Sequence, residues 1–215
     1  MARILSMLGR KALSDPKTIL KKDYGTTPES DEYLINAYRE GDEGVFTELV
    51  ERHLKSTYSF AVRLTGNEND AEDIVQESFL KAWKHLKKFD PQKARFKTWL
   101  MQIVRNTAID SLRKKRIVPL STFDIEGENV LSDTLPDDAP LPDEIAAYAG
   151  DVAALESALQ QLSPPYREIL LLYNGNDFSF DEAASILKIP TNTAKSRHRR
   201  AIQTLRDIVR MHPNR

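Results

Sequence analysis

Residues 117–150 interrupt an otherwise helix-forming sequence and limit the folds available to the chain. This segment contains four prolines and eight carboxylates but no lysine or arginine. Prolines and charge of one sign oppose a packed helix or strand and are typical of a linker. On both sides of the segment, apolar residues recur at helical spacing, and no run alternates as in a strand. The sequence therefore predicts an all-α protein of two small helical domains joined by a flexible acidic linker.

The expected domain boundaries follow from this break. Each domain lies near the lower size limit for an independent core, since the chain has 215 residues. We expect a flexible basic arm over residues 1–30, a helical domain over 31–116, the acidic linker over 117–150 and a second helical domain over 151–215. The expected helices span residues 31–40, 43–64, 69–87 and 94–115, then 145–161, 165–173, 179–187 and 192–209.

Composition excludes several classes of function. The chain has no cysteine, which excludes disulfides, thiolate nucleophiles and cysteine-based zinc sites. Its four histidines are scattered without metal-ligand spacing, so neither a metal nor another cofactor is expected. No run approaches the roughly 20 apolar residues of a membrane-spanning helix, and the N-terminal arm lacks the apolar core of a secretory signal. A cytoplasmic location is expected.

The net charge of −1 conceals a strong segregation of charge along the first domain. Residues 31–77 carry four basic and twelve acidic side chains, whereas residues 78–116 carry twelve basic and two acidic ones. The sign changes within the segment 66–90, which reads as one helix. Acidic residues at the start of a helix and basic residues at its end are favoured by the helix dipole, so this segment needs no partner to explain its charges.

The helical wheel of this segment nevertheless separates an inward face from an outward one. Asp70 is expected to cap the helix. The inward face consists of Ala71, Ile74, Val75, Ser78, Phe79, Ala82 and Leu86, and the outward face of Asp73, Gln76, Glu77 and Leu80. A leucine framed by acids and an amide fits a docking surface for a basic partner helix, although one exposed leucine is also ordinary in a soluble protein.

The next predicted helix has a basic face close to aromatic residues. Its inward stripe is Phe96, Trp99, Leu100, Ile103 and Thr107, while Arg95, Gln102, Arg105, Asn106, Arg113 and Arg116 lie along another side. Cations that follow phosphates, together with rings that receive unstacked bases, are typical of single-stranded nucleic acid binding. A solvated basic face above packed aromatic residues would give the same pattern, so both interpretations stay open on periodicity alone.

The C-terminal domain reads as helix, turn, short helix, turn and a longer basic helix, which is the helix-turn-helix arrangement. Ser163 and Thr191 are expected to cap the first and last of these helices. In the last helix, Asn192, Lys195, Ser196, Arg199 and Arg200 are predicted to project from the buried stripe of Ala194, Ala201, Ile202, Leu205 and Ile208. Arginine and lysine at such positions contact guanine edges and phosphates in the major groove. His198 is expected to be packed.

Three segments, in order, carry a resemblance to a known family. "DAEDIVQESFLKAW", "FKTWLMQIVRNTAIDSLRK" and "LSPPYREILLLY" with "FSFDEAASILKIPTNTAKSRHRRA" resemble the extracytoplasmic-function (ECF) sigma factors of the sigma-70 family, group IV. Such proteins retain only the second and fourth conserved regions, and the resemblance covers about residues 31–116 and 151–208. It implies a sigma factor, not an enzyme, that binds core RNA polymerase and directs promoter-specific initiation, often in stress responses. The implied partners are the β′ clamp helices and β flap of the polymerase, promoter DNA, and an anti-sigma factor or other regulator.

The resemblance also implies roles for individual residues. Polymerase binding falls on Asp70, Glu72, Asp73, Gln76, Glu77 and Leu80. Recognition and melting of the promoter −10 element falls on Phe89, Arg95, Lys97, Trp99, Gln102, Arg105, Asn106, Arg113 and Lys114. Recognition of the −35 element falls on Asn192, Lys195, Ser196, Arg197, Arg199 and Arg200. The linker is expected to thread towards the active cleft and RNA exit path of the polymerase.

The chain departs from the family pattern in its last helix, where Asn192, Ala194, His198 and Arg199 replace glycine, valine, leucine and histidine. Promoter sequence preference therefore cannot be carried over. The role of residues 1–30 stays open between contact with DNA and contact with a regulator.

Two other classes of function are weighed against this one. The main alternative is an autonomous helix-turn-helix repressor, which should dimerise and bind a palindromic site without polymerase. An enzyme would need more than the carboxylates Asp70, Glu72 and Asp73, and no nucleophile or metal pair accompanies them. Opening about ten base pairs costs on the order of 14 kcal/mol, and the chain has no Walker-type loop to couple nucleotide hydrolysis to that work. DNA melting must therefore use the surface of a partner.

Overall fold

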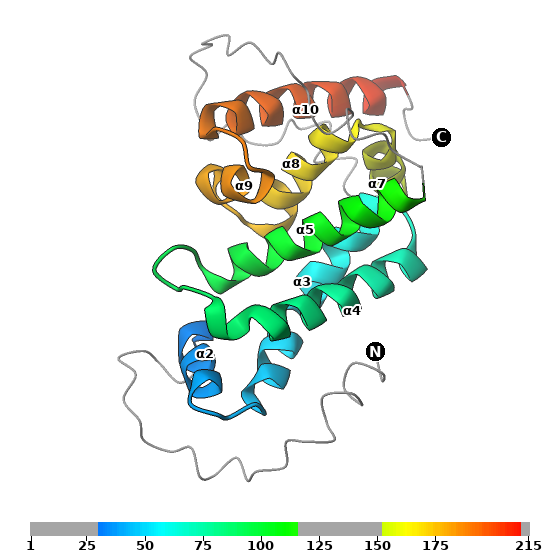
Figure 1. The fold of residues 1–215 in the computed structure, drawn as a ribbon. Coiled ribbons are helices and arrows are strands. Elements are labelled where there is room, and N and C mark those ends of the chain that lie inside the picture. Colours follow the sequence, from blue (N-terminus) through cyan, green and yellow to red (C-terminus); the bar gives the residue numbers. More distant parts are fainter. Residues whose placement is uncertain (1–29, 116–151, 212–215) are drawn as a thin grey trace.

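The computed structural model describes residues 30–115 and 152–211, and every regular element within those ranges is a helix (Figure 1). The elements are α2 (Asp31–Arg39), α3 (Val45–Thr65), α4 (Glu68–His85), the 3-10 helix η2 (Leu86–Lys88), α5 (Phe96–Lys114), α7 (Val152–Gln161), α8 (Pro164–Asn176), α9 (Phe180–Leu187) and α10 (Thr191–Met211). The all-α prediction is confirmed, and the expected helices match within a few residues where the chain is described. The N-terminal arm and the acidic linker lie outside the described residues.

The N-terminal domain consists of α2 to α5, in which α3, α4 and α5 pack against one another and α2 packs on α3. Gly66 ends α3 in the left-handed region, with φ of +70°, and its N–H donates to the carbonyl of Val62 at 2.7 Å. Asn67 then caps α4, since its side chain accepts from the N–H of Asp70 at 3.0 Å. The expectation that Asp70 is the cap is wrong, because the helix begins one turn earlier.

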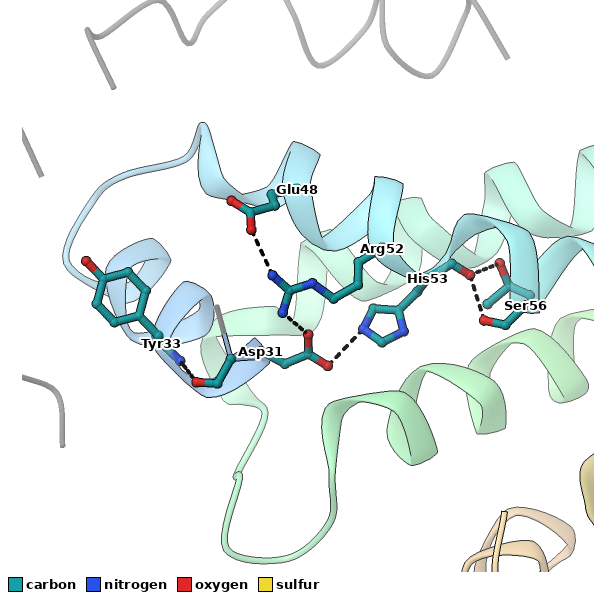
Figure 2. Close-up of polar contacts among 8 residues, drawn as sticks. Asp31, Tyr33, Glu48, Arg52, His53 and Ser56 are labelled. Carbon is teal, nitrogen blue, oxygen red and sulfur yellow. Dashed lines mark hydrogen bonds and ion pairs between the residues drawn. The ribbon is translucent and has the colours of Figure 1, made fainter. Parts of the chain in front are cut away.

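A polar cluster fixes α2 against α3 (Figure 2). The carboxylate of Asp31 accepts from Nη1 of Arg52 at 2.9 Å and lies 2.8 Å from Nε2 of His53. Arg52 also donates to Glu48 at 2.7 Å. Burial alone would raise the pKa of Asp31, but hydrogen bonds and charge from His53 and Arg52 hold that pKa below its ordinary value. The start of α2 is therefore anchored by charge as well as by its apolar face.

The C-terminal domain consists of α7 to α10, and α10 packs on α8 and α9. Ser179 and Glu182 form a capping box at the start of α9, which fixes where the short helix begins. Lys188 ends α9 in the left-handed region, with φ of +57°, and α10 follows after a short turn. Helix α10 begins at Thr191 itself, so Thr191 is its first residue and not the predicted cap before it, and its hydroxyl donates to Asp181 at 2.8 Å. The predicted helix-turn-helix geometry is present.

The two domains pack directly on each other. Helix α3 contacts α7 and α8, and α5 contacts α9, so that α5 lies between α4 on one side and α9 on the other (Figure 1). One continuous apolar core extends through both domains, from Phe46, Phe60, Phe79 and Phe96 to Ile169 and Leu205. Burying each large side chain of this kind contributes roughly 1.5–3 kcal/mol. The arrangement of the domains, which the sequence left open, is a closed one.

Candidate functional surfaces

An exposed acidic surface runs along α4, and we call it the acidic α4 face: Glu72, Asp73, Gln76, Glu77 and Leu80. Glu72, Asp73, Glu77 and Leu80 are exposed, and Gln76 is half-buried. The predicted inward face is buried throughout, from Ala71 to Leu86. Glu77 pairs with Lys81 at 2.8 Å on the same helix, whereas Glu72 and Asp73 form no salt bridge within the described parts of the chain. Their carboxylates are open to a basic partner.

Two large apolar side chains stand beside these acids. Leu80 is 38% exposed and Trp83 is 36% exposed, and with Met211 they are the exposed large hydrophobic residues of the described chain. Residues three positions apart on a helix share a face, so Leu80 and Trp83 extend the acidic α4 face by one turn. Sequence reasoning missed Trp83, although the spacing of residues 73, 76, 80 and 83 continues one helical row. An apolar centre with an acidic rim has the composition of a protein interface.

Asp70 behaves differently from the rest of the predicted polymerase-binding set. Its carboxylate forms an ion pair with Lys115, at the end of α5, and the side chain is half-buried. Asp70 therefore joins α4 to α5 within the domain.

The predicted DNA-binding residues of α5 and the preceding loop divide into two groups, and we call them together the basic α5 face. Arg95, Asn106, Arg113 and Lys114 are exposed. Phe89 is only 5% exposed, and its ring packs against Phe96 and Trp99 with centroids 5.8 and 5.0 Å away. The expectation that Phe89 offers its ring to a base is wrong in this structure, because the ring belongs to the core. Trp99 is half-buried and keeps one edge accessible.

The remaining residues of the basic α5 face contact the C-terminal domain. Nε and Nη2 of Arg105 donate to the two carboxylate oxygens of Glu168 at 2.8 and 3.0 Å. Arg105 is only 9% exposed, and Glu168 is fully buried. The prediction that Arg105 lies on an open side of α5 is therefore wrong, because α8 covers it. Neither Glu168 nor its role was foreseen, although a single acid inside the apolar run "REILLLY" signals a buried partner.

Further polar contacts surround this pair. Arg95 and Thr98 contact Oε1 of Glu182 on α9 at 3.4 and 3.2 Å. Lys97 donates to the carbonyl of Asn176 at 2.5 Å, and its ammonium lies 4.6 Å from the ring centroid of Phe178. A longer contact of 3.5 Å joins the amide of Gln102 to the carbonyl of Ser185. About half of the predicted −10 residues thus contact other parts of this protein.

Electrostatics at this interface follow from burial and counter-charge. Burial raises the pKa of Glu168, and the charges of Arg105 and Arg197 act in the opposite direction. Burial would also raise the pKa of Glu182, but hydrogen bonds from Ser179 and Thr98 and the charge of Arg95 hold it below its ordinary value. Two carboxylates of the C-terminal domain therefore sit against cations of the N-terminal one.

Helix α10 presents part of the predicted −35 surface. Asn192 is exposed, and Lys195, Arg199 and Arg200 are half-buried. Ser196 is only 5% exposed, so the expectation that it projects outward is wrong, and Arg197, which the resemblance assigned to the −35 element, is only 4% exposed. Arg197 lies close enough to the buried Glu168 that its charge opposes the rise in the pKa of that acid caused by burial.

His198 is packed, as expected. Its ring contacts the rings of Tyr173 and Phe180 at centroid distances of 4.8 and 5.3 Å, and Nε2 lies 2.8 Å from Oδ1 of Asn174. Burial lowers the pKa of His198 to about 4. This histidine therefore holds α10 against α8 and α9 in its neutral form.

Two other kinds of site have no candidate among the described residues. Among the described residues, no group of three histidine or acidic side chains is placed to hold a metal ion. Within the same ranges, no helix is both long enough and apolar enough to span a bilayer.

Comparison with known proteins gives the family. Residues 49–117 match the model of sigma-70 region 2, and residues 153–205 match that of sigma-70 region 4. The ECF RNA polymerase sigma factor SigW of Bacillus subtilis is 30% identical over 179 residues, which cover 82% of this chain and 95% of SigW. The chain belongs to the ECF sigma factors of the sigma-70 family, which bind core RNA polymerase and promoter DNA and direct promoter-specific initiation of transcription.

Two solved structures share the fold across both domains. The structure of CnrH in complex with the cytosolic domain of CnrY is 25% identical, with a TM-score of 0.61, and the match covers 84% of this chain and 97% of CnrH. The sigma factor RpoE of Bartonella quintana, in complex with the anti-sigma factor NepR, is 27% identical, with a TM-score of 0.58, and the match covers 79% and 98%. The fold class and the function predicted from sequence are confirmed, and the repressor alternative is not favoured.

Proposed function

We propose that three surfaces of this sigma factor divide the work of initiation. The acidic α4 face with Trp83 binds the β′ clamp helices of core RNA polymerase. The basic α5 face engages the −10 element, and the exposed residues of α10 engage the −35 element while the C-terminal domain lies near the β flap. Under this proposal residues 31–116 and 151–215 are the two functional domains, residues 117–150 connect them, and the protein works without enzymatic activity in the cytoplasm, where polymerase is found.

One observation gives the main support for assigning polymerase binding to the acidic α4 face. Leu80 and Trp83 are large apolar side chains on the surface of a charged helix, and the carboxylates of Glu72 and Asp73, which form no ion pair in the described chain, lie about two to three turns earlier on that helix. Apolar side chains exposed in a cluster are costly in water unless a partner covers them. Unpaired carboxylates around them select a basic partner and speed its association.

The experiment that tests this assignment is a pull-down with core polymerase. We expect Asp73→Lys/Leu80→Ala to abolish capture of core polymerase while the circular dichroism and the unfolding midpoint stay unchanged, because both side chains are exposed. The matched control is Asp207→Lys/Met211→Ala, which also reverses one charge and truncates one large apolar side chain, on the exposed end of α10. Normal capture by the α4 variant would refute the assignment.

A regulator is proposed on the basis of the solved relatives. RpoE of Bartonella quintana is seen with the anti-sigma factor NepR, and CnrH with the cytosolic domain of CnrY. We infer that an anti-sigma protein restrains this chain as well. Co-purification from the native host, with and without the Asp73→Lys/Leu80→Ala changes, tests whether such a protein exists and whether it shares the acidic α4 face.

A further inference from the structure

We propose that a pocket beside α3 binds the N-terminal segment of this chain, residues 1–13, through an apolar floor and an acidic rim. The inference does not depend on the roles proposed for α4, α5 and α10. It gives an occupant to a surface that none of those roles uses, and it gives the basic N-terminal arm a binding site on the protein itself.

An open pocket of about 510 Å³ lies where α3, the start of α4 and α7 meet. We call its half-buried residues Leu54, Tyr58 and Val62 the floor. They recur at helical spacing along α3 and pack against the core on their inner side. The outer side of this apolar row stays partly exposed, so the pocket has room for further apolar side chains.

The exposed rim of the pocket is mainly acidic. Glu51 of α3 and Glu68 of α4 are exposed and form no salt bridge with any described residue. Glu156 of α7 lies 3.7 Å from Nε of Arg63. Lys55 also lines the pocket, so three acids stand against two cations, and one of these cations already has an acidic neighbour.

The titration of the floor tyrosine agrees with a negative potential in the pocket. Burial, and then the charges of Glu68 and Glu72, raise the pKa of Tyr58 above its ordinary value. An apolar floor under a negative potential favours a ligand that carries both apolar and basic side chains.

Three segments of the chain lie outside the described residues, and their compositions differ. Residues 1–22 carry six basic side chains and one acidic one, with Ile4, Leu5, Met7 and Leu8 close together near the start. The linker, residues 117–150, carries eight carboxylates and no lysine or arginine, so an acidic rim repels it. Residues 212–215 contain no large apolar side chain. Charge and apolar content therefore select the N-terminal segment among the three.

The start of α2 attaches the N-terminal segment close to the pocket. Asp31, the first residue of α2, accepts from Arg52 at 2.9 Å and lies 2.8 Å from Nε2 of His53 (Figure 2). Both contacts are within one helical turn of Leu54, where the floor begins. The floor and rim extend along α3 for about 17 Å, whereas residues 14–29 can span up to about 50 Å. Such a tether gives the segment an effective concentration on the order of mM at the pocket, which a separate protein does not have.

The chain has no native cysteine, so a pair of introduced cysteines can report where the segment binds. Ser6→Cys lies within the apolar part of the segment, and Ser59→Cys lies at the pocket, where the native serine is half-buried. The matched control is Ser6→Cys/Gln76→Cys, because Gln76 is also half-buried and stands on the acidic α4 face. In the same redox buffer, we expect full-length Ser6→Cys/Ser59→Cys to form its intramolecular disulfide at least about tenfold faster than the control. Non-reducing gel electrophoresis measures both rates.

Charge variants of the Ser6→Cys/Ser59→Cys protein test the rim. Glu51→Lys/Glu68→Lys should slow disulfide formation at least about threefold, and the further change Arg3→Glu/Arg10→Glu should restore the rate. Glu43→Lys/Asp207→Lys reverses two exposed acids outside the pocket and should leave the rate unchanged. Circular dichroism of each variant shows whether its helices are intact.

A second set of variants tests the floor without altering any residue of α2 to α10. Leu5→Asn/Leu8→Asn removes two apolar side chains from the segment and keeps its charge. We expect this change in the Ser6→Cys/Ser59→Cys protein to slow disulfide formation at least about threefold, because the floor loses its apolar contacts. Lys17→Asn/Lys22→Asn, later in the arm, is the control for added asparagine and should slow it less.

Each outcome bears on the proposal directly. Equal rates for the Ser59→Cys and Gln76→Cys pairs would overturn it, and so would a rate that either the rim variants or the Leu5→Asn/Leu8→Asn change left unaltered. A disulfide that joined two molecules, seen as a dimer on the gel, would assign the pocket to a second copy of the chain and would also overturn it. Polymerase capture is measured separately, so failure here leaves the proposed function as it stands.

Discussion

Arg105 and Glu168 face each other across the two domains with two parallel hydrogen bonds, of 2.8 and 3.0 Å, in a site closed to solvent. The pair lies 63 positions apart in sequence and spans the acidic linker. Burial of two charges is offset only where each has its partner. The main effect of the pair is therefore to favour one arrangement of the two domains. Its contribution to the stability of the protein is smaller.

Removal of both partners should cost less than the sum of the two single removals. We expect Arg105→Ala to lower the free energy of unfolding by about 3 kcal/mol, because it leaves a carboxylate buried without its counter-charge. The double variant Arg105→Ala/Glu168→Ala should lose at least about 1 kcal/mol less than the sum of the two single variants. Urea unfolding of all four proteins measures this coupling. Simple additivity would show that the two side chains do not act as a pair.

Trp83 should contribute to polymerase binding. We expect Trp83→Ala to weaken the affinity for core polymerase by about 2 kcal/mol, because tryptophan near the centre of an interface often dominates its energy. Lys84→Ala is the control, since that side chain is exposed at the next position of α4. Titration of labelled sigma factor with core polymerase gives both values. An unchanged affinity in the folded Trp83→Ala variant would remove Trp83 from the docking surface.

The exposed part of α10 should read the −35 element. We expect Lys195→Ala and Arg199→Ala each to reduce −35-dependent transcription by about 1–3 kcal/mol of binding energy, the range for loss of one good contact. Run-off transcription on matched promoters with an intact or a scrambled −35 element isolates this effect. Gln203→Ala, on an exposed position later in α10, is the control. If the two variants and wild type gave equal amounts of transcript from the promoter with an intact −35 element, the recognition surface would lie elsewhere.

His198 should make stability depend on pH. The folded protein keeps this ring neutral down to about pH 4, whereas the unfolded chain takes up a proton near the ordinary value of 6.5. Because the unfolded state binds the extra proton, the free energy of unfolding should decrease as pH falls from about 6.5 to 4. Between about pH 6.5 and 5 we expect wild type to lose up to about 2 kcal/mol more than His198→Phe, which retains a ring in the site. If the free energy of unfolding of wild type and His198→Phe changed equally with pH, His198 would not be the source of the pH dependence.

Asp31 should show a dependence of the same sign in a more acidic range. Its pKa is below the ordinary value, so its contribution is present at neutral pH and is lost as pH falls through the acidic range. We expect Asp31→Asn to destabilise the protein by about 1–2 kcal/mol at neutral pH, and the difference from wild type to shrink below about pH 4. Thermal unfolding at several pH values tests this. Glu32→Gln, in the same first turn, separates the helix-dipole effect from the contacts with α3.

Much of this molecule could be predicted from sequence because its helices are amphipathic and have clear start and stop signals. The inward face of α4 is buried as periodicity indicated, and α9 starts and stops where Ser179 and Lys188 place it. The helix caps were harder to predict. Asn67 precedes the acidic cluster and competes with Asp70 for the role of N-cap.

The closed interface could not be predicted, because periodicity identifies a polar face and does not say what covers it. Arg105 and Ser196 read as outward positions, but both are buried, and Arg105 lies against Glu168 of the other domain. The prediction for Phe89 was wrong for a related reason. An aromatic residue in a loop fits a base-binding ring as well as a core ring, and only the packing with Phe96 and Trp99 distinguishes the two.

Gly66 meets two demands at one position. Its left-handed backbone ends α3, and a Cβ atom there would lie 3.0 Å from Oε1 of Gln160 on α7 of the other domain. Every substitution at residue 66 therefore strains the turn and crowds the opposite domain in one step. Variants at this residue therefore provide a graded series in which steric bulk, rather than charge, is varied at the contact between the end of α3 and Gln160 of α7.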